Sequence, residues 1–118
     1  MDQSDTVFVR ISPPRAYVRA VGELDFVNAP RLDDQLSAAI AAGCTNFSLD
    51  FSDVTFCDAS TIGVIVSLDR TLRATNGSLD IVEVSDQVRR VFYVLGLDNM
   101  LSPDPTGADG PEENPSIS

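Results

Sequence analysis

The chain has 118 residues, enough for one domain, and 43% of them are apolar, so it can bury a sizeable core. Its formal net charge is −10, from 18 acidic and 8 basic residues, and such an acidic surface repels nucleic acid and anionic membranes. The absence of His and Lys excludes Ser-His-Asp and Cys-His catalysis, histidine-ligated metals, lysine-bearing phosphate loops and Schiff bases.

These exclusions predict a binding protein, not an enzyme, with no cofactor and no metal. No apolar run approaches the roughly 20 residues of a membrane span, and the acidic opening Met1–Asp5 does not resemble a secretory signal. We therefore expect a cytoplasmic protein whose partner presents a basic face.

The first elements are two strands. Val7–Ile11 has the alternating pattern of a strand and is rich in β-branched residues, and Pro13-Pro14 then forces a turn. Ala16–Val21 reads as the second strand of a hairpin, followed by the loop "GELD" at Gly22–Asp25.

The next elements alternate helix and strand. The first helix has Asn28 as a plausible N-cap and Pro30 in its first turn, and Gly43 ends it. Its apolar residues recur at helical spacing: Ala29, Leu32, Leu36 and Ile40. Asn46–Phe51 alternates as a strand. A second helix follows, ended by Thr75–Gly77, with the stripe Ile62, Ile65, Leu68 and Leu72.

The last elements are a strand and a third helix. Leu79–Val84 is the strand, Ser85 caps the helix and Gly96 ends it. The predicted inner face of this helix is Val88, Val91, Phe92 and Leu95, and a short strand near Met100-Leu101 is also possible.

This order predicts an α/β fold. Strands joined through helices pair in parallel with right-handed crossovers, and the hairpin adds an antiparallel pair. We expect one domain over residues 1–101, with a mixed, mostly parallel sheet of four to five strands and about three to four helices. Residues 102–118 hold four of the seven prolines and four acids without a base, which is typical of a disordered acidic tail.

Three segments resemble the STAS domain, and more narrowly the bacterial anti-sigma factor antagonists. They are "GELD", "LDFSDVTFCDASTIG" and "NGSLDIVEVSDQVRRVFYVLGLD", in this order between Val7 and Leu101. The resemblance implies a protein that binds an anti-sigma factor and so frees a sigma factor. It also implies that the anti-sigma factor is a protein kinase of the histidine-kinase-like ATPase superfamily, with a serine phosphatase resetting the switch.

The family's junction reads Asp-Ser-[Ser/Thr]-Gly, and its first Ser accepts the phosphate. Carried over, the aspartate falls on Asp58, the acceptor on Ala59, the second hydroxyl on Ser60 and the glycine on Thr61. The usual acceptor is therefore missing, and we expect no phosphorylation of the usual kind. Ser60 and Thr61 are the alternative phosphoacceptors, although Ser60 is rotated by about 100° around the helix axis from the usual position, which disfavours in-line transfer. The resemblance implies partner binding by Asp25, Asp58, Ala59, Ser60 and Thr61.

The same residues also have structural interpretations. Ser60, Thr61 or Asp58 could cap the second helix, and Asp25 could turn its own loop. Cys44 and Cys57 lie beyond opposite ends of a strand about 20 Å long, which predicts buried free thiols, not a disulfide. Asp58 beside Cys57 should disfavour the thiolate.

Two other functions remain open. A STAS scaffold or sensor subunit of another signalling assembly would have the same fold. A response-regulator receiver would use Asp53 or Asp58 as acceptor, but receivers need a late lysine that this chain lacks.

Overall fold

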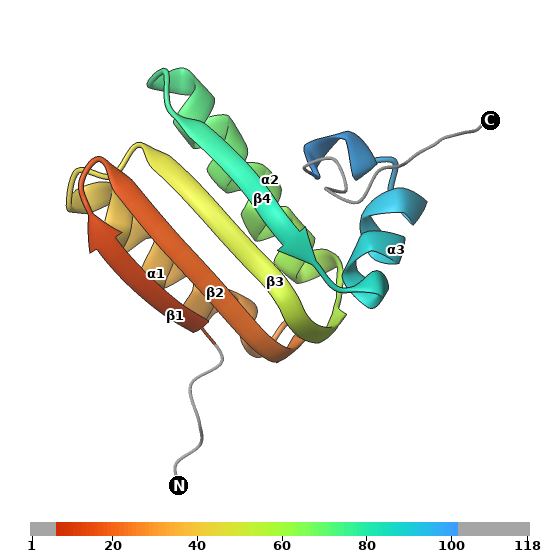
Figure 1. Cartoon of the computed structure of the whole chain (residues 1–118). Coiled ribbons are helices and arrows are strands. Elements are labelled where there is room, and N and C mark those ends of the chain that lie inside the picture. Colours follow the sequence, from red (N-terminus) through yellow and green to blue (C-terminus); the bar gives the residue numbers. More distant parts are fainter. Residues whose placement is uncertain (1–6, 102–118) are drawn as a thin grey trace, which may run out of the picture.

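The computed structural model describes residues 7–101 (Figure 1), so the predicted tail lies outside the described residues. Its sheet has the order β1-β2-β3-β4. β1 (Val7–Ser12) pairs antiparallel with β2 (Arg15–Leu24), whereas β3 (Asn46–Cys57) and β4 (Ser78–Val84) continue the sheet in parallel. The predicted mixed sheet opened by an N-terminal hairpin is confirmed.

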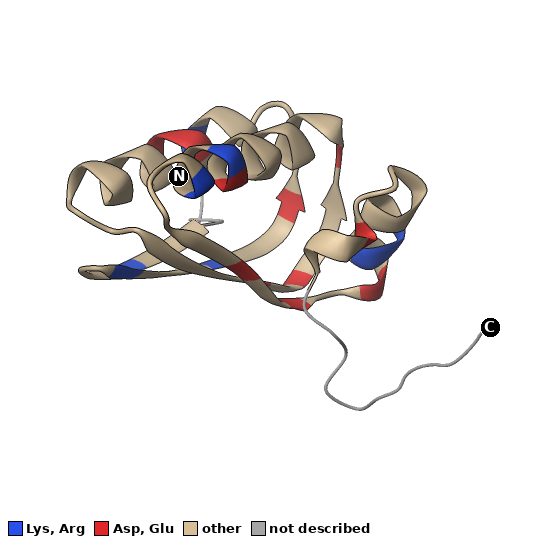
Figure 2. Cartoon of the chain, turned by 90° about the horizontal axis from the view of Figure 1, so that it is seen from above, with Lys and Arg blue, Asp and Glu red and all other residues tan. Residues whose placement is uncertain are grey.

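Two long helices cover one face of this sheet. α1 (Ala29–Ala41) and α2 (Ala59–Ala74) lie side by side on that face in Figure 2. The shorter α3 (Asp86–Val94) packs against β3 and β4 and leads into the 3-10 helix η1 (Asp98–Met100). No helix within the described range is long and apolar enough to cross a membrane.

The hydrophobic core fills the space between the sheet and these helices. Alternate strand residues turn inward, as the period of two requires, and the fully buried ones include Val18, Leu49 and Phe51. The stripe predicted for the second helix is buried throughout: Ile62, Ile65, Leu68 and Leu72. Burying such a side chain stabilises the fold by about 1.5–3 kcal/mol.

The strands run further than the sequence predicted. β2 continues through Gly22–Leu24, which were expected to form a loop, because two bulges let the strand stay paired with β3. Gly22 has φ of +85°, a conformation that favours glycine. β3 continues beyond Phe51 to Cys57, because pairing with β2 holds Asp53 and Val54 in the strand.

The C-terminal part differs in two details. Leu95 was predicted to face inward, but its side chain is 47% exposed, because the helix ends at Val94. The inner face consists of the buried Val88 and Phe92 and the partly buried Val91. The expected last strand is a single bridge from Leu101 to Ile81, preceded by a 3-10 turn.

Candidate functional site

The candidate site is the junction where β3 gives way to α2. Asp58 stands between them with extended backbone, and its side chain caps the helix. Its Oδ1 accepts from the backbone N–H groups of Ser60 (3.0 Å) and Thr61 (3.3 Å). Of the capping residues the sequence left open, Asp58 is the one that caps, so capping by Ser60 or Thr61 is wrong.

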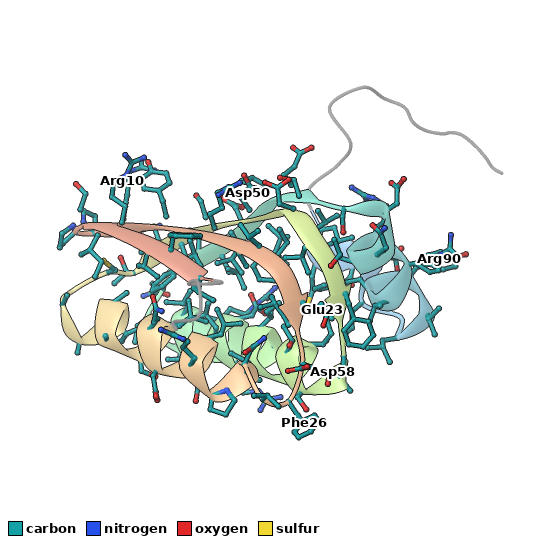
Figure 3. The ribbon with its side chains drawn as sticks, turned by 90° about the horizontal axis from the view of Figure 1, so that it is seen from below. Arg10, Glu23, Phe26, Asp50, Asp58 and Arg90 are labelled. Carbon is teal, nitrogen blue, oxygen red and sulfur yellow. The ribbon has the colours of Figure 1, made fainter. Side chains whose placement is uncertain are left out.

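Asp58 also connects the junction to the loop between β2 and α1. Its Oδ2 accepts from the backbone N–H of Phe26 at 3.1 Å. Figure 3 shows Asp58 and Phe26 together at one end of the molecule. A single carboxylate therefore accepts from three backbone donors on two chain segments, which fixes the segments relative to each other.

Thr61 supplies a second connection between the same segments. Its hydroxyl donates to the backbone carbonyl of Leu24 at 2.8 Å, and the residue is 0% exposed. The Thr61 hydroxyl is therefore buried and hydrogen-bonded, and a kinase cannot reach it in this conformation. Ser60 differs, because it is exposed and its hydroxyl has no hydrogen-bond partner within residues 7–101.

Asp25 shapes its own loop. Its Oδ1 accepts from the N–H groups of Val27 (3.0 Å) and Asn28 (3.3 Å), and its carbonyl accepts from Asn28 and Ala29. Asn28 occupies the N-cap position of α1 as predicted, yet its side chain makes no capping hydrogen bond and instead donates to the Glu23 carbonyl.

The β2–α1 loop presents two apolar side chains that sequence reasoning missed. Phe26 and Val27 are 70% and 69% exposed. Both follow "GELD" directly, and together the two neighbouring side chains form an exposed apolar patch. A pair of apolar residues in a predicted loop, with no helical or strand period to bury them, was the available signal.

Gly63 extends the exposed surface along α2. It lies three residues after Ser60, so the two occupy the same side of the helix, and both are exposed. A Cβ built on Gly63 would meet nothing within 4 Å, so packing inside the protein does not require a glycine there. We call Phe26, Val27, Ala59, Ser60 and Gly63 the junction surface.

The two cysteines are buried and free, as predicted. Burial, followed by the charge of Asp58, raises the pKa of the Cys57 thiol to about 11. Cys44 precedes β3 and Cys57 is its last residue, so a strand of 12 residues separates them. The described part of the chain holds no group of three or more His, Cys, Asp or Glu side chains that could bind a metal ion.

Comparisons with known proteins point to one family. The family model described as "Mlab, STAS domain" matches residues 7–102. An anti-sigma-B factor antagonist of Staphylococcus aureus strain NCTC 8325 is 27% identical over 84 residues, which cover 71% of this chain and 78% of that one. The protein of the same name in Staphylococcus epidermidis is 26% identical with the same coverage.

Solved structures agree with this result. The anti-sigma factor antagonist SpoIIAA in its unphosphorylated form matches with a TM-score of 0.74 and 26% identity, over 81% of this chain and 85% of that chain. An anti-sigma factor antagonist from Mycobacterium paratuberculosis has the same fold, with a TM-score of 0.73 and 24% identity over 86% of this chain and 87% of its own.

Proposed function

The chain belongs to the STAS domain family, and on this basis we propose that it is an anti-sigma factor antagonist, which binds an anti-sigma factor and so releases a sigma factor. It acts in the cytoplasm as a binding protein, not as an enzyme. The observation that carries the proposal is the junction surface, where the exposed Phe26 and Val27 of the β2–α1 loop are held against the start of α2 by the hydrogen bonds of Asp58 and Thr61.

The junction surface suits protein binding for two reasons. Aromatic side chains such as Phe26 are enriched in the buried centre of protein interfaces. Because hydrogen bonds already fix the β2–α1 loop against the start of α2, little conformational entropy is lost when a partner binds. The overall charge of −10 favours a partner with basic groups around this contact.

Ser60 is the proposed point of control. The anti-sigma factor is a histidine-kinase-like ATPase that transfers the γ-phosphoryl group of ATP to Ser60 Oγ, with release of ADP and of the hydroxyl proton. The phosphate lies at the N-terminus of α2, close to Asp58, which accepts from the Ser60 N–H. The added phosphate repels the neighbouring Asp58 carboxylate and would lose its hydration within the apolar contact, so the complex dissociates until a serine phosphatase removes the phosphate.

The position of the acceptor distinguishes this protein from the usual pattern. Ala59 has no hydroxyl, and Thr61 is buried, so Ser60 is the accessible hydroxyl of the junction. Compared with residue 59 it is rotated by about 100° around the helix axis, so the kinase must approach α2 from a different side. Phosphorylation at this position is therefore slower than at a serine in place of Ala59.

The proposal is tested by titrating the unphosphorylated chain against each anti-sigma factor of its organism, and by repeating the titration with Ser60→Asp. We expect one anti-sigma factor to bind, and Ser60→Asp to weaken that binding by about tenfold, because the added carboxylate repels Asp58 and loses its hydration in the apolar contact. Ser37→Asp on the exposed side of α1 is the matched control and binds normally. If the chain binds other STAS proteins and no anti-sigma factor, it is instead a scaffold subunit and the proposal is wrong.

A further inference from the structure

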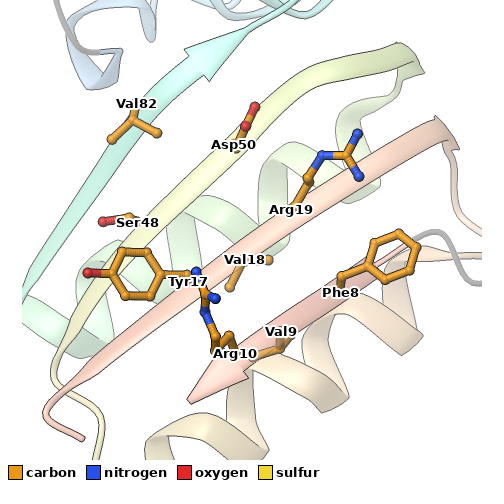
Figure 4. Close-up of a pocket in the computed structure, with 9 residues that line it drawn as sticks. All are labelled: Phe8, Val9, Arg10, Tyr17, Val18, Arg19, Ser48, Asp50 and Val82. Carbon is orange, nitrogen blue, oxygen red and sulfur yellow. The ribbon is translucent and has the colours of Figure 1, made fainter. Parts of the chain in front are cut away.

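The face of the sheet opposite α1 and α2 carries a groove of about 410 Å³ (Figure 4). Phe8, Arg10, Tyr17 and Arg19 line it from β1 and β2, and Val82 lines it from β4. Three of these are apolar or aromatic side chains left 41–47% exposed: Phe8, Tyr17 and Val82. The groove is distant from the junction surface, since Arg10 and Asp58 project from opposite sides of the molecule in Figure 3.

The β1–β2 half of this face carries positive charge that the described residues do not neutralise. The Arg10 guanidinium stacks over the Tyr17 ring, 5.6 Å from its centroid, and has no carboxylate partner within residues 7–101. Arg15 projects on the same side as Tyr17 and likewise has no carboxylate partner there, whereas Arg19 is paired with Asp53. In a chain of net charge −10, two such cations on one face form a site for an acidic segment.

The chain itself contains that segment. Residues 102–118, which we call the acidic tail, carry Asp104, Asp109, Glu112 and Glu113 and no basic residue. On the opposite half of the same face, Asp50 on β3 and Asp80 on β4 repel these acids. The charge pattern therefore directs an acidic segment to β1 and β2.

The geometry decides which acids reach the cations. Leu101 is bridged to Ile81 beside β4, and strands lie about 4.8 Å apart, so β1 is about 19 Å from Leu101 across the sheet. An extended chain covers about 3.3 Å per residue, so Asp104 reaches only about 10 Å and Asp109 about 26 Å. Asp109, Glu112 and Glu113 can contact β1 and Asp104 cannot.

We propose that Asp109, Glu112 and Glu113 of the acidic tail dock on Arg10 and Arg15, and that the tail thereby covers the groove. Tethering gives the tail an effective concentration in the millimolar range, so contacts that are too weak to hold a free peptide still populate the docked state. The docked tail shields the exposed apolar side chains of this face from other proteins and leaves the junction surface free to bind.

The test is paramagnetic relaxation in the full chain, with a nitroxide attached at Gly110→Cys. The native thiols do not compete for the label, because Cys44 and Cys57 are 1% and 3% exposed. We expect selective broadening of backbone amide signals in Phe8–Arg10 and Tyr17–Arg19. At 1 M salt the broadening disappears, because the screening length falls from about 10 Å at 0.1 M to about 3 Å.

Charge variants make the test specific. Arg10→Glu combined with Arg15→Glu abolishes the broadening, whereas the charge-matched control, Arg70→Glu with Arg90→Glu on α2 and α3, retains it. In the tail, Asp109→Asn with Glu112→Gln and Glu113→Gln abolishes it, and Asp104→Asn retains it.

Three results would overturn the proposal. The first is the absence of selective broadening in β1 and β2, and the second is broadening that survives the double arginine variant. The third comes from mixing isotope-labelled chain without nitroxide and unlabelled chain with nitroxide. Broadening in that mixture means that the tail docks on a second copy and not on its own sheet.

Discussion

At the scale of single residues, some side chains of the junction form hydrogen bonds that hold the fold together, and others are free to contact a partner. The side chains of Asp58 and Thr61 form hydrogen bonds within the protein. The Asp58 carboxylate accepts from three backbone N–H groups, and the Thr61 hydroxyl donates to the Leu24 carbonyl. The hydroxyl of Ser60, between Ala59 and Thr61, makes no hydrogen bond in the described chain. A kinase or a partner can therefore engage Ser60 without disrupting the fold.

The first prediction compares Thr61→Val with Ser60→Ala. The valine keeps the shape of Thr61 but removes its 2.8 Å hydrogen bond to the buried Leu24 carbonyl, which keeps only the 3.2 Å bond from the Asp58 N–H. This lowers the free energy of unfolding by about 0.5–1.5 kcal/mol. The alanine at position 60 changes it by less than about 0.5 kcal/mol. Urea unfolding of both variants measures the difference, and equal stabilities would contradict the assignment of the two hydroxyls.

The second prediction concerns Cys57 at alkaline pH. Because its pKa is raised from 9.0 to about 11, the unfolded chain loses this proton between pH 9 and 11 while the folded chain keeps it. The free energy of unfolding therefore falls as pH rises through this window, and Cys57 contributes about 1 kcal/mol to the fall by pH 10.

Urea unfolding at pH 8 and pH 10 measures this contribution against Cys57→Ala as the control. The alanine variant is expected to lose less stability between the two pH values than the wild type. Equal losses would mean that the thiol ionises equally in both states.

At the scale of elements, periodicity predicted the helices and tertiary pairing decided the strand ends. The stripe from Ile62 to Leu72 is buried as predicted, because residues three and four apart share one helix side. Gly22 in β2 and Ser52-Asp53 in β3 read as turn residues, yet pairing between the two strands retains them. The conformational preferences of single residues do not predict which strands pair or how far the pairing extends.

The site was predictable only in part. The sequence marked the position of the junction, because apolar alternation changes to helical spacing there. Asp58, Ser60 and Thr61 are all acceptable caps, and the choice depends on where pairing with β2 ends, since β3 continues to Cys57. The apolar pair Phe26-Val27, outside any helical or strand period, was a local signal of exposure, but its position beside Asp58 depends on the path of the β2–α1 loop.

The third prediction is a gain of stability with a loss of binding at α2. Gly63→Ala replaces a helix-interior glycine at an exposed position with open space around it, so the free energy of unfolding rises by up to about 1 kcal/mol. The same methyl group stands on the junction surface and weakens partner binding. Urea unfolding and titration calorimetry measure the two effects.

Gly77→Ala is the contrasting control for Gly63→Ala. A Cβ at Gly77 would stand 2.2 Å from the Thr45 carbonyl oxygen, so this alanine destabilises the fold. If Gly63→Ala left partner binding unchanged, Gly63 would not belong to the contact.

At the scale of the whole molecule, the two proposed binding regions lie on different sides of one small domain. α1 and α2 cover a single face of the sheet, and the parallel strands bring the β2–α1 and β3–α2 connections to the same edge (Figure 1). That edge carries the junction surface, and the uncovered face carries the groove. The domain can therefore bind a partner at its edge while its open face is occupied by another segment.

The most direct test of this account is the affinity of the anti-sigma factor for the wild type and for Phe26→Ala, measured by titration calorimetry. An exposed interface anchor is worth about 1.4 kcal/mol or more, so we predict at least roughly tenfold weaker binding with the free energy of unfolding unchanged. Phe8→Ala, an exposed aromatic residue on the opposite face, is the control and binds as the wild type does. Equal affinity of Phe26→Ala and the wild type would contradict the assignment of the junction surface as the partner-binding site.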